Sequence, residues 1–367
     1  MGQGERLKGL DDFKWIAAAL VVAIHTSPLE SINKTADFLF TRVLARLSVP
    51  FFFMVTGYFV LYGAYKAGNS GKIRQTFMKL FFLYLGTTLL YLPVRLYQFV
   101  GKEEFFDNNA PNMILRQAGK AFFFDGTYYH LWYLPAAGLG LILAWAGLSV
   151  FGRKGAFLCA SVLYMIGLMG DSYYGLTEKI PLLRDCYESM FQMFSYTRNG
   201  LFFAPLFLLL GYEAAVKTHF DSKVKGLIQE DSNNLRENRI IFYGTLLLMC
   251  GEGLGLHILG WQRHDSMYLF LPFCMQGLFG LLLLKRTGIF NNDFFKKVQW
   301  RTFYEKGPML LYFLHPAVIL AVRGFVKVTG LTFLLTVSPI YYIAVLGGSL
   351  VLVYVSLRIL EKILKRN

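Results

Sequence analysis

The chain has 367 residues, of which 55% are hydrophobic, 17% aromatic and only 16% charged. A soluble domain carries roughly a quarter charged residues. Long apolar stretches between short charged loops instead predict an integral membrane protein. We expect the net charge of +14 to set membrane topology, because the sequence has no Arg-rich arm, no aromatic and basic strand pattern and no zinc-ligand spacing. Composition therefore argues against nucleic-acid binding.

Ten apolar segments predict an all-α polytopic membrane bundle of about ten transmembrane helices, in one domain over residues 1–367. In chain order, the segments are 14–29, 47–64, 77–99, 131–151, 155–170, 199–216, 240–259, 267–284, 308–323 and 338–357. The first resembles a signal peptide, but no small-x-small cleavage site follows it, so we expect a retained helix. With the N-terminus inside, Lys and Arg gather on the inner side, which places both termini in the cytoplasm.

Two predicted outer loops are long, at 100–130 and 171–198, and both are rich in Tyr, Phe, Asn and carboxylates. Such loops either shape a binding surface or serve as solvated connectors. The four cysteines are scattered, with no CxxC and no Cys/His cluster, at Cys159, Cys186, Cys250 and Cys274. They indicate neither a metal site nor a disulfide framework.

Polar residues at membrane depth need an explanation, because burying them in lipid is costly. Lys14 and His25 are eleven positions apart in the first predicted helix, or roughly 16 Å along its axis. Lys14 then lies near the cytoplasmic edge, as a donor-steering cation or a snorkelling anchor, and His25 lies well across the membrane. Glu252 lies deep inside another predicted helix. An ionised Glu there needs a partner such as His25, His257 or an Arg, or else binds substrate or a proton.

Four short motifs follow one another along the chain: LDDFKWIAAALVVAIH from Leu10, SVPFFFMVTGY from Ser48, HLWYL from His130 and YFLHP from Tyr312. In this order they resemble the acyltransferase-3 superfamily. Its members carry Arg or Lys, ten residues and then His in the first helix. Its V-P-x-F-F-x-x-S-G-Y/F block is similar to the second motif, with Thr56 where Ser is commoner.

The resemblance implies a bacterial plasma-membrane enzyme that moves an acyl group, usually acetyl, from acyl-coenzyme A to an outer acceptor such as a cell-wall or surface glycan. It implies no permanently bound cofactor. His25 would be the general base, since imidazole suits proton transfer near neutral pH, and the burial argument adds Glu252 as a catalytic candidate. Other candidates bind the acceptor or support the site: His130, Trp132, Tyr312 and His315, with Asp125, Tyr128 and Tyr129 less directly. Trp132 also suits an interfacial belt, and His315 before Pro316 a structural role.

One predicted donor contact departs from the family pattern. The family often carries Arg-x-x-Arg at the cytoplasmic entry of the third helix, whereas IRQTFMKL offers Arg74 and Lys79 at a different spacing. The resemblance therefore suggests Lys14, Arg74 and Lys79 as donor-binding residues. The positive-inside rule equally explains Lys72, Arg74 and Lys79, as anchors at the cytoplasmic entry of the third predicted helix.

Within the superfamily, the segments AIHTSPL, RLSVPFFFMVTGYFV and RNGLFFAPLFLLLGY resemble the membrane domain of VanT-type serine racemases of vancomycin resistance. In those proteins a cytoplasmic racemase domain with pyridoxal phosphate follows the membrane part. This chain stops at Asn367, so we expect neither here, and a C-terminal or separate racemase is a candidate partner.

Two further hypotheses stay open beside acyl transfer. The first is L-serine transport or supply to a racemase, and the second is an anchor for a catalytic domain. Broken helices at the midplane would favour transport, and GEGLGLH is a candidate break. However, no symmetry between the two halves of the sequence is visible.

Overall fold

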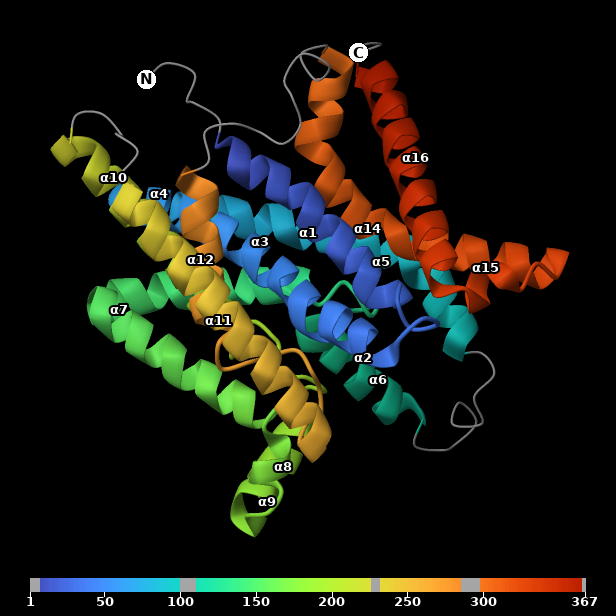
Figure 1. Cartoon of the computed structure of the whole chain (residues 1–367), viewed down its shortest axis with the longest axis horizontal. Coiled ribbons are helices and arrows are strands. Elements are labelled where there is room, and N and C mark those ends of the chain that lie inside the picture. Colours follow the sequence, from blue (N-terminus) through green and yellow to red (C-terminus); the bar gives the residue numbers. More distant parts are fainter. Residues whose placement is uncertain (1–6, 100–109, 226–231, 285–297, 365–367) are drawn as a thin grey trace. The chain divides into compact units, whose positions relative to one another are not determined.

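The computed structural model describes residues 7–99, 110–225, 232–284 and 298–364, which form helices and turns with no strand among them (Figure 1). This confirms the predicted all-α class. The α-helices are α1 (Lys8–Thr26), α2 (Lys34–Asp37), α3 (Ser48–Thr56), α4 (Tyr62–Lys66), α5 (Gly71–Phe99), α6 (Ala110–Lys120), α7 (Tyr133–Met169), α8 (Tyr174–Thr177), α9 (Pro181–Phe191), α10 (Ala204–Lys225), α11 (Ser232–Leu259), α12 (Leu271–Leu284), α14 (Val298–Thr329), α15 (Phe333–Thr336) and α16 (Ser338–Leu364). Shorter π- and 3₁₀-helices are η1 (Phe38–Val43), η2 (Leu44–Leu47), η3 (Gly57–Leu61) and η5 (Ala121–Asp125).

Six helices of the described chain are long and apolar enough to cross a membrane: Lys34–Lys66, Gly71–Tyr97, Tyr133–Met169, Asn233–Leu259, Arg301–Thr329 and Ser338–Ile363. The predicted spans 14–29, 199–216 and 267–284 fall in α1, α10 and α12 instead. Helix α1 has 19 residues and carries several charges near its start, and α12 has only 14 residues. The count of ten spans therefore stays a prediction.

Helix α7 is two helical arms joined at a bend. Gly152 has φ 65° and ψ −177° inside it, a backbone conformation that a side chain disfavours. Figure 1 shows the two arms diverging from this point. The bend falls between the predicted spans 131–151 and 155–170, so the sequence placed this break within a few residues.

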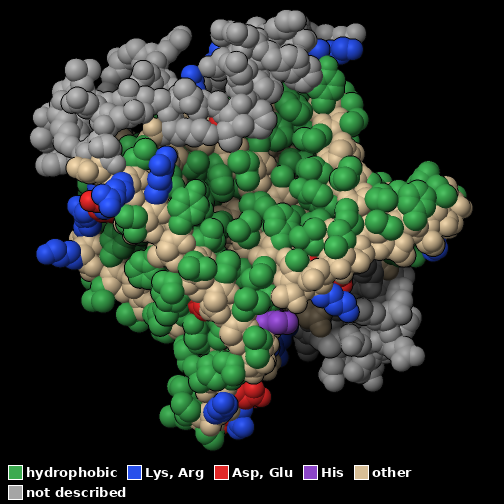
Figure 2. Space-filling view, viewed as in Figure 1, with side chains coloured by type: hydrophobic (Ala, Val, Ile, Leu, Met, Phe, Trp, Pro, Cys, Tyr) green, Lys and Arg blue, Asp and Glu red, His purple; other side chains and the backbone are tan. Residues whose placement is uncertain are grey.

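Apolar side chains cover much of the described surface. Figure 2 shows hydrophobic side chains over much of the part of this face that is not grey, with few charges among them. Only 17% of the apolar window in Gly71–Tyr97 is buried, and the same holds for Asn233–Leu259. Such a surface is expected where helices contact lipid. Its long apolar helices and their exposed apolar side chains therefore identify the chain as a multi-pass membrane protein.

The helices form two compact units. The first combines Met1–Phe52, Glu230–Gly253 and Phe273–Asn367, and the second combines Phe53–Gln229 and Leu254–Pro272. The two units interleave along the chain, and a single domain over residues 1–367 stays a prediction.

In the first unit, α1 and α14 pack side by side and run parallel. Near their starts, the Trp15 indole donates to the Tyr304 carbonyl oxygen at 3.2 Å and stacks on Phe303. Near the other end, the rings of His25 and His315 lie 5.4 Å apart. The two contacts are about 15 Å apart along α1 and about 17 Å apart along α14, so the register holds over several turns.

Helix α16 packs antiparallel to α14. The Phe303 and Tyr354 rings lie 6.3 Å apart, and Arg323 donates to the Tyr341 hydroxyl at 3.3 Å. The start of α1 and the end of α16 therefore lie at the same end of this unit. The placement of both termini in the cytoplasm stays a prediction.

In the second unit, α5 and α10 pack on α7. The predicted outer loop 171–198 is folded rather than a loose connector, since it contains α8 and α9. Their aromatic core consists of Tyr174, Tyr187, Phe191, Phe194 and Phe202. In the other predicted loop, 110–125 are helical and 100–109 lie outside the described residues.

Candidate functional site

The first unit brings together two of the predicted site histidines. His25 lies in the last turn of α1 and is half-buried, and His315 on α14 is fully buried. Their rings are stacked, with centroids 5.4 Å apart and planes 20° apart. Tyr312, also predicted, lies beside them with its ring 6.4 Å from that of His315. Residues 290 positions apart in sequence therefore form one imidazole pair.

The sequence explains why both rings face the contact between the helices. On α1 the buried face runs through Ala18 and Val22, and His25 follows three residues later on the same side. On α14, Pro316 has no N–H, which frees the carbonyl of Tyr312 from helical bonding. The His315 Nδ1 donates to the carbonyl oxygen of Leu311 at 3.2 Å. This holds its proton on Nδ1 and directs Nε2 away from the helix backbone.

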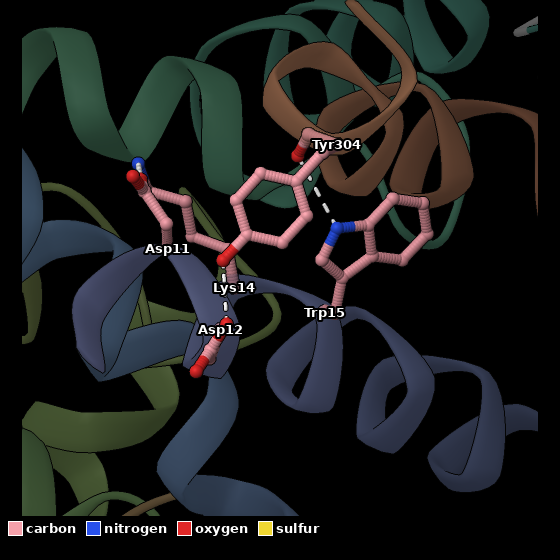
Figure 3. Close-up of polar contacts among 5 residues, drawn as sticks. All are labelled: Asp11, Asp12, Lys14, Trp15 and Tyr304. Atoms are coloured by element: carbon pink, nitrogen blue, oxygen red, sulfur yellow. Dashed lines mark hydrogen bonds and ion pairs between the residues drawn. The ribbon is translucent and has the colours of Figure 1, made fainter. Parts of the chain in front are cut away.

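Lys14 lies on the same face of α1 as His25, three turns earlier, because eleven positions bring a helix back to within about 20° of its starting direction. Its ammonium contacts the Asp11 carboxylate at 2.8 Å. Figure 3 shows this pair beside a second link, in which the Tyr304 hydroxyl donates to the buried Asp12 carboxylate at 2.5 Å. The start of α1 is therefore fixed to α14 by Trp15 and Asp12, and Lys14 is held by Asp11.

Glu252 is half-buried in the part of α11 that belongs to the first unit, and His257 further along α11 is exposed. The predicted catalytic role of Glu252 stays a prediction. Among the described residues, no three His, Cys, Asp or Glu side chains are placed to share a metal ion.

The predicted donor-binding residues Arg74 and Lys79 are exposed on α5 in the second unit. With four neighbours on the same helix they line an open depression of about 690 Å³. Lys72 instead donates to the carbonyl of Phe59 in the π-helix η3 at 2.8 Å, so it is a structural anchor. Donor binding by Arg74 and Lys79 at this depression stays a prediction.

His130 and Trp132 are buried in the second unit. The His130 ring meets the edges or faces of three tyrosines, at 5.1 Å from Tyr91, 5.6 Å from Tyr128 and 5.4 Å from Tyr129. The guanidinium of half-buried Arg198 covers the Trp132 ring at 5.0 Å. These aromatic contacts suit a rigid wall more than a mobile interfacial belt.

Asp125 has a structural role that its position in sequence did not indicate. Its two carboxylate oxygens accept from the Ser195 N–H at 2.9 and 3.0 Å. This bond ties the π-helix η5 to the segment before α10, and an acceptor contact stays a prediction for it.

A buried carboxylate that sequence reasoning missed lies directly after α7. Asp171 is fully buried, and its Oδ1 accepts from the N–H groups of Ser266 and Met267 at 2.8 and 2.9 Å. Burial raises the pKa of Asp171 to about 6, against the opposing effect of these bonds. Burial, with Arg198 and Arg263, lowers the pKa of His264 to about 4. The carboxylate holds the loop between α11 and α12 to the end of α7.

These two shifts predict a pH response. Protonated Asp171 stabilises the fold in acid, and that contribution is lost as pH rises through about 6. His264 has the opposite effect. Between its lowered pKa of about 4 and its ordinary pKa, the imidazole binds a proton in the unfolded chain but not in the folded one, so its contribution to stability is lost as pH falls. We expect Asp171→Asn, which keeps the acceptor oxygen, to lose thermal stability more steeply than wild type between pH 6.5 and 4.5. Thermal unfolding in detergent at both values measures this, and equal slopes would contradict it.

The chain resembles known proteins over most of its length. The acyltransferase-3 family, described as an acyltransferase domain, matches residues 7–358. An amino-acid racemase from Enterococcus faecalis is 42% identical over 294 residues, or 79% of this chain and 38% of the relative. A second from that species is 36% identical over 327 residues (88% and 42%), and a serine/alanine racemase from Enterococcus gallinarum is 35% identical over 322 residues (85% and 41%).

The chain spans about two fifths of the length of these curated relatives. No solved structure matches it. The names of the relatives confirm the predicted likeness to VanT-type membrane-bound racemases. Because the family match runs from residue 7 to residue 358 and includes all four motifs, the chain belongs to the acyltransferase-3 family.

Proposed function

We propose that the protein is a membrane acyltransferase that moves an acyl group, acetyl by family resemblance, from acyl-coenzyme A to an acceptor outside the cytoplasm. The observation that carries the proposal is the stacked pair of His25 and His315. An imidazole held in one orientation inside a helical membrane unit is what general-base chemistry at a fixed point requires.

In the proposed step, His25 takes the proton of an acceptor hydroxyl as the hydroxyl oxygen attacks the thioester carbonyl. The carbon–sulfur bond breaks, the acyl group stays on the acceptor oxygen, and the thiolate of coenzyme A takes the proton back from the imidazolium. His315 orients the His25 ring by stacking against it. The basic residues Lys14, Arg74 and Lys79 are candidates for attracting the phosphates of the donor.

A second candidate is L-serine supply to a racemase, favoured by the names of the relatives. In that case the matched region would serve as the membrane part of a racemase protein, and the intramembrane histidines would line a substrate path. Polar groups inside membrane helices serve transport as readily as catalysis. A cytoplasmic racemase domain or partner would then receive the serine.

One preparation distinguishes the two. We expect purified protein in liposomes to release coenzyme A from acetyl-coenzyme A when saccharide acceptors are present, and to transfer labelled acetyl to one of them. Liposomes without protein give the background. Accumulation of labelled L-serine without any acyl transfer would replace the enzymatic proposal with transport.

A further inference from the structure

The chain immediately after His25 is fastened to the start of α16. Helix α1 ends at Thr26, and Ser27 has φ 46° and ψ 66°. Among the described residues it is the one non-glycine residue in the left-handed region, a conformation that most side chains disfavour. The backbone is therefore turned sharply one residue beyond the last helical turn that carries His25.

Four hydrogen bonds join the next residues to Ser338. The Ser338 hydroxyl donates to the Pro28 carbonyl at 3.0 Å and accepts from the Ser31 N–H at 3.0 Å. The Ser338 N–H donates to the Ser31 hydroxyl oxygen at 3.0 Å. The two hydroxyl oxygens are 2.9 Å apart. Because the Ser338 hydroxyl proton goes to Pro28, Ser31 must donate in that last bond. We call these two serines with Pro28 the serine clasp.

The remainder of the turn is closed by its own side chains. The Asp37 carboxylate accepts from the Leu29 N–H at 2.9 Å, and Asn33 accepts from the Ala36 N–H at 2.9 Å. Asp37 and Ser338 are buried, although Ser31 is exposed. The turn is therefore rigid in itself, and the clasp is what fixes it to another helix.

We propose that Ser31 and Ser338 are positioning residues for His25, an inference whose catalytic consequence rests on the proposed acyl transfer. The clasp links the end of α1 to α16, and α16 packs along α14, which carries His315. Both members of the imidazole pair are thus tied into one frame at the end where they meet. Without the clasp, the last turn of α1 can rotate or fray, and the His25 ring loses its stacking on His315.

The test uses Ser31→Ala, Ser338→Ala and the double variant. Ser349→Ala is the matched control, because Ser349 is also buried on α16 and, within the described parts of the chain, its hydroxyl bonds to its own helix, at the Val345 carbonyl at 2.6 Å. We expect each clasp variant to lower kcat roughly tenfold with little change in the KM for the donor. The double variant should be no worse than the single variants, since all break the same unit. Ser338→Thr, which keeps the hydroxyl, should restore most of kcat.

A second readout is independent of activity. Diethylpyrocarbonate modifies exposed imidazoles. The folded, full-length protein is treated with the reagent, and mass spectrometry of its peptides then gives the rate of modification at His25. We expect that rate to rise several-fold in the clasp variants and to stay at the wild-type value in Ser349→Ala. If wild type transfers no acyl group, the proposed function fails, but this rate still decides the clasp. An unchanged rate at His25 in both single variants overturns the inference.

Discussion

Replacement of His25 by Ala is expected to reduce acyl transfer by between about 10² and 10⁴, the range that a general base contributes. The loss should fall on kcat, because the imidazole takes a proton only as the acceptor attacks. The variant should insert and fold as wild type does, since the ring is half-buried and the neighbouring core of Ala18 and Val22 is unchanged. Initial rates of coenzyme A release in liposomes measure the effect.

Substitutions of His315, whose ring stacks on His25, are expected to reduce acyl transfer by smaller, graded amounts. His315→Ala removes the stacking surface but not the base, so we expect a smaller loss than for His25→Ala. His315→Asn should lie between wild type and His315→Ala, because its amide can still donate to the Leu311 carbonyl. Ser349→Ala again serves as the control, because its hydroxyl bonds to the Val345 carbonyl within α16. If His25→Ala transfers acyl groups at the wild-type rate, His25 is not the general base.

Several features of the fold could be predicted because they depend on local sequence. Apolar length gives the helices, and the Gly-Arg-Lys-Gly stretch at 152–155 gives the bend in α7. The first helix shows the limit of that approach. Of the charges at its start, which exclude α1 from the apolar helices, Lys14 pairs with Asp11 and Asp12 accepts a hydrogen bond from the Tyr304 hydroxyl.

The residues of the candidate site could be named from the sequence, but their arrangement in space could not. The motifs pointed to His25 and His315 separately, and Pro316 hinted that a polar group would be needed nearby. That the two rings stack follows from the register of α1 on α14, which is set by large side chains at Trp15 and Phe303. Ser31 and Ser338 carry no signal in sequence, because isolated serines near helix ends are common and their pairing spans 307 positions. Contacts of this kind appear only once helices distant in sequence are packed.

Two glycines in the second unit are expected to be the least tolerant packing positions in the described chain. A Cβ on Gly57 would collide with the carbonyl oxygen of Leu208, and a Cβ on Gly211 with that of Met54. In both cases the obstacle is backbone of the facing helix, which cannot rotate away. The motif glycine Gly57 and its counterpart on α10 thus let two helices touch at their backbones, as small residues do in membrane bundles.

We therefore expect Gly57→Ala and Gly211→Ala each to destabilise the fold by about 3 kcal/mol, at the upper end of overpacking effects. Thermal unfolding in detergent should show a drop of roughly 4 °C. Gly86→Ala is the matched control, since a Cβ there meets nothing within 4 Å on α5 and Ala is the better helix former. The comparison separates packing from propensity, because all three changes add the same methyl group to a helix. Equal unfolding temperatures for Gly211→Ala and Gly86→Ala would mean that the two helices are held apart by something other than these glycines.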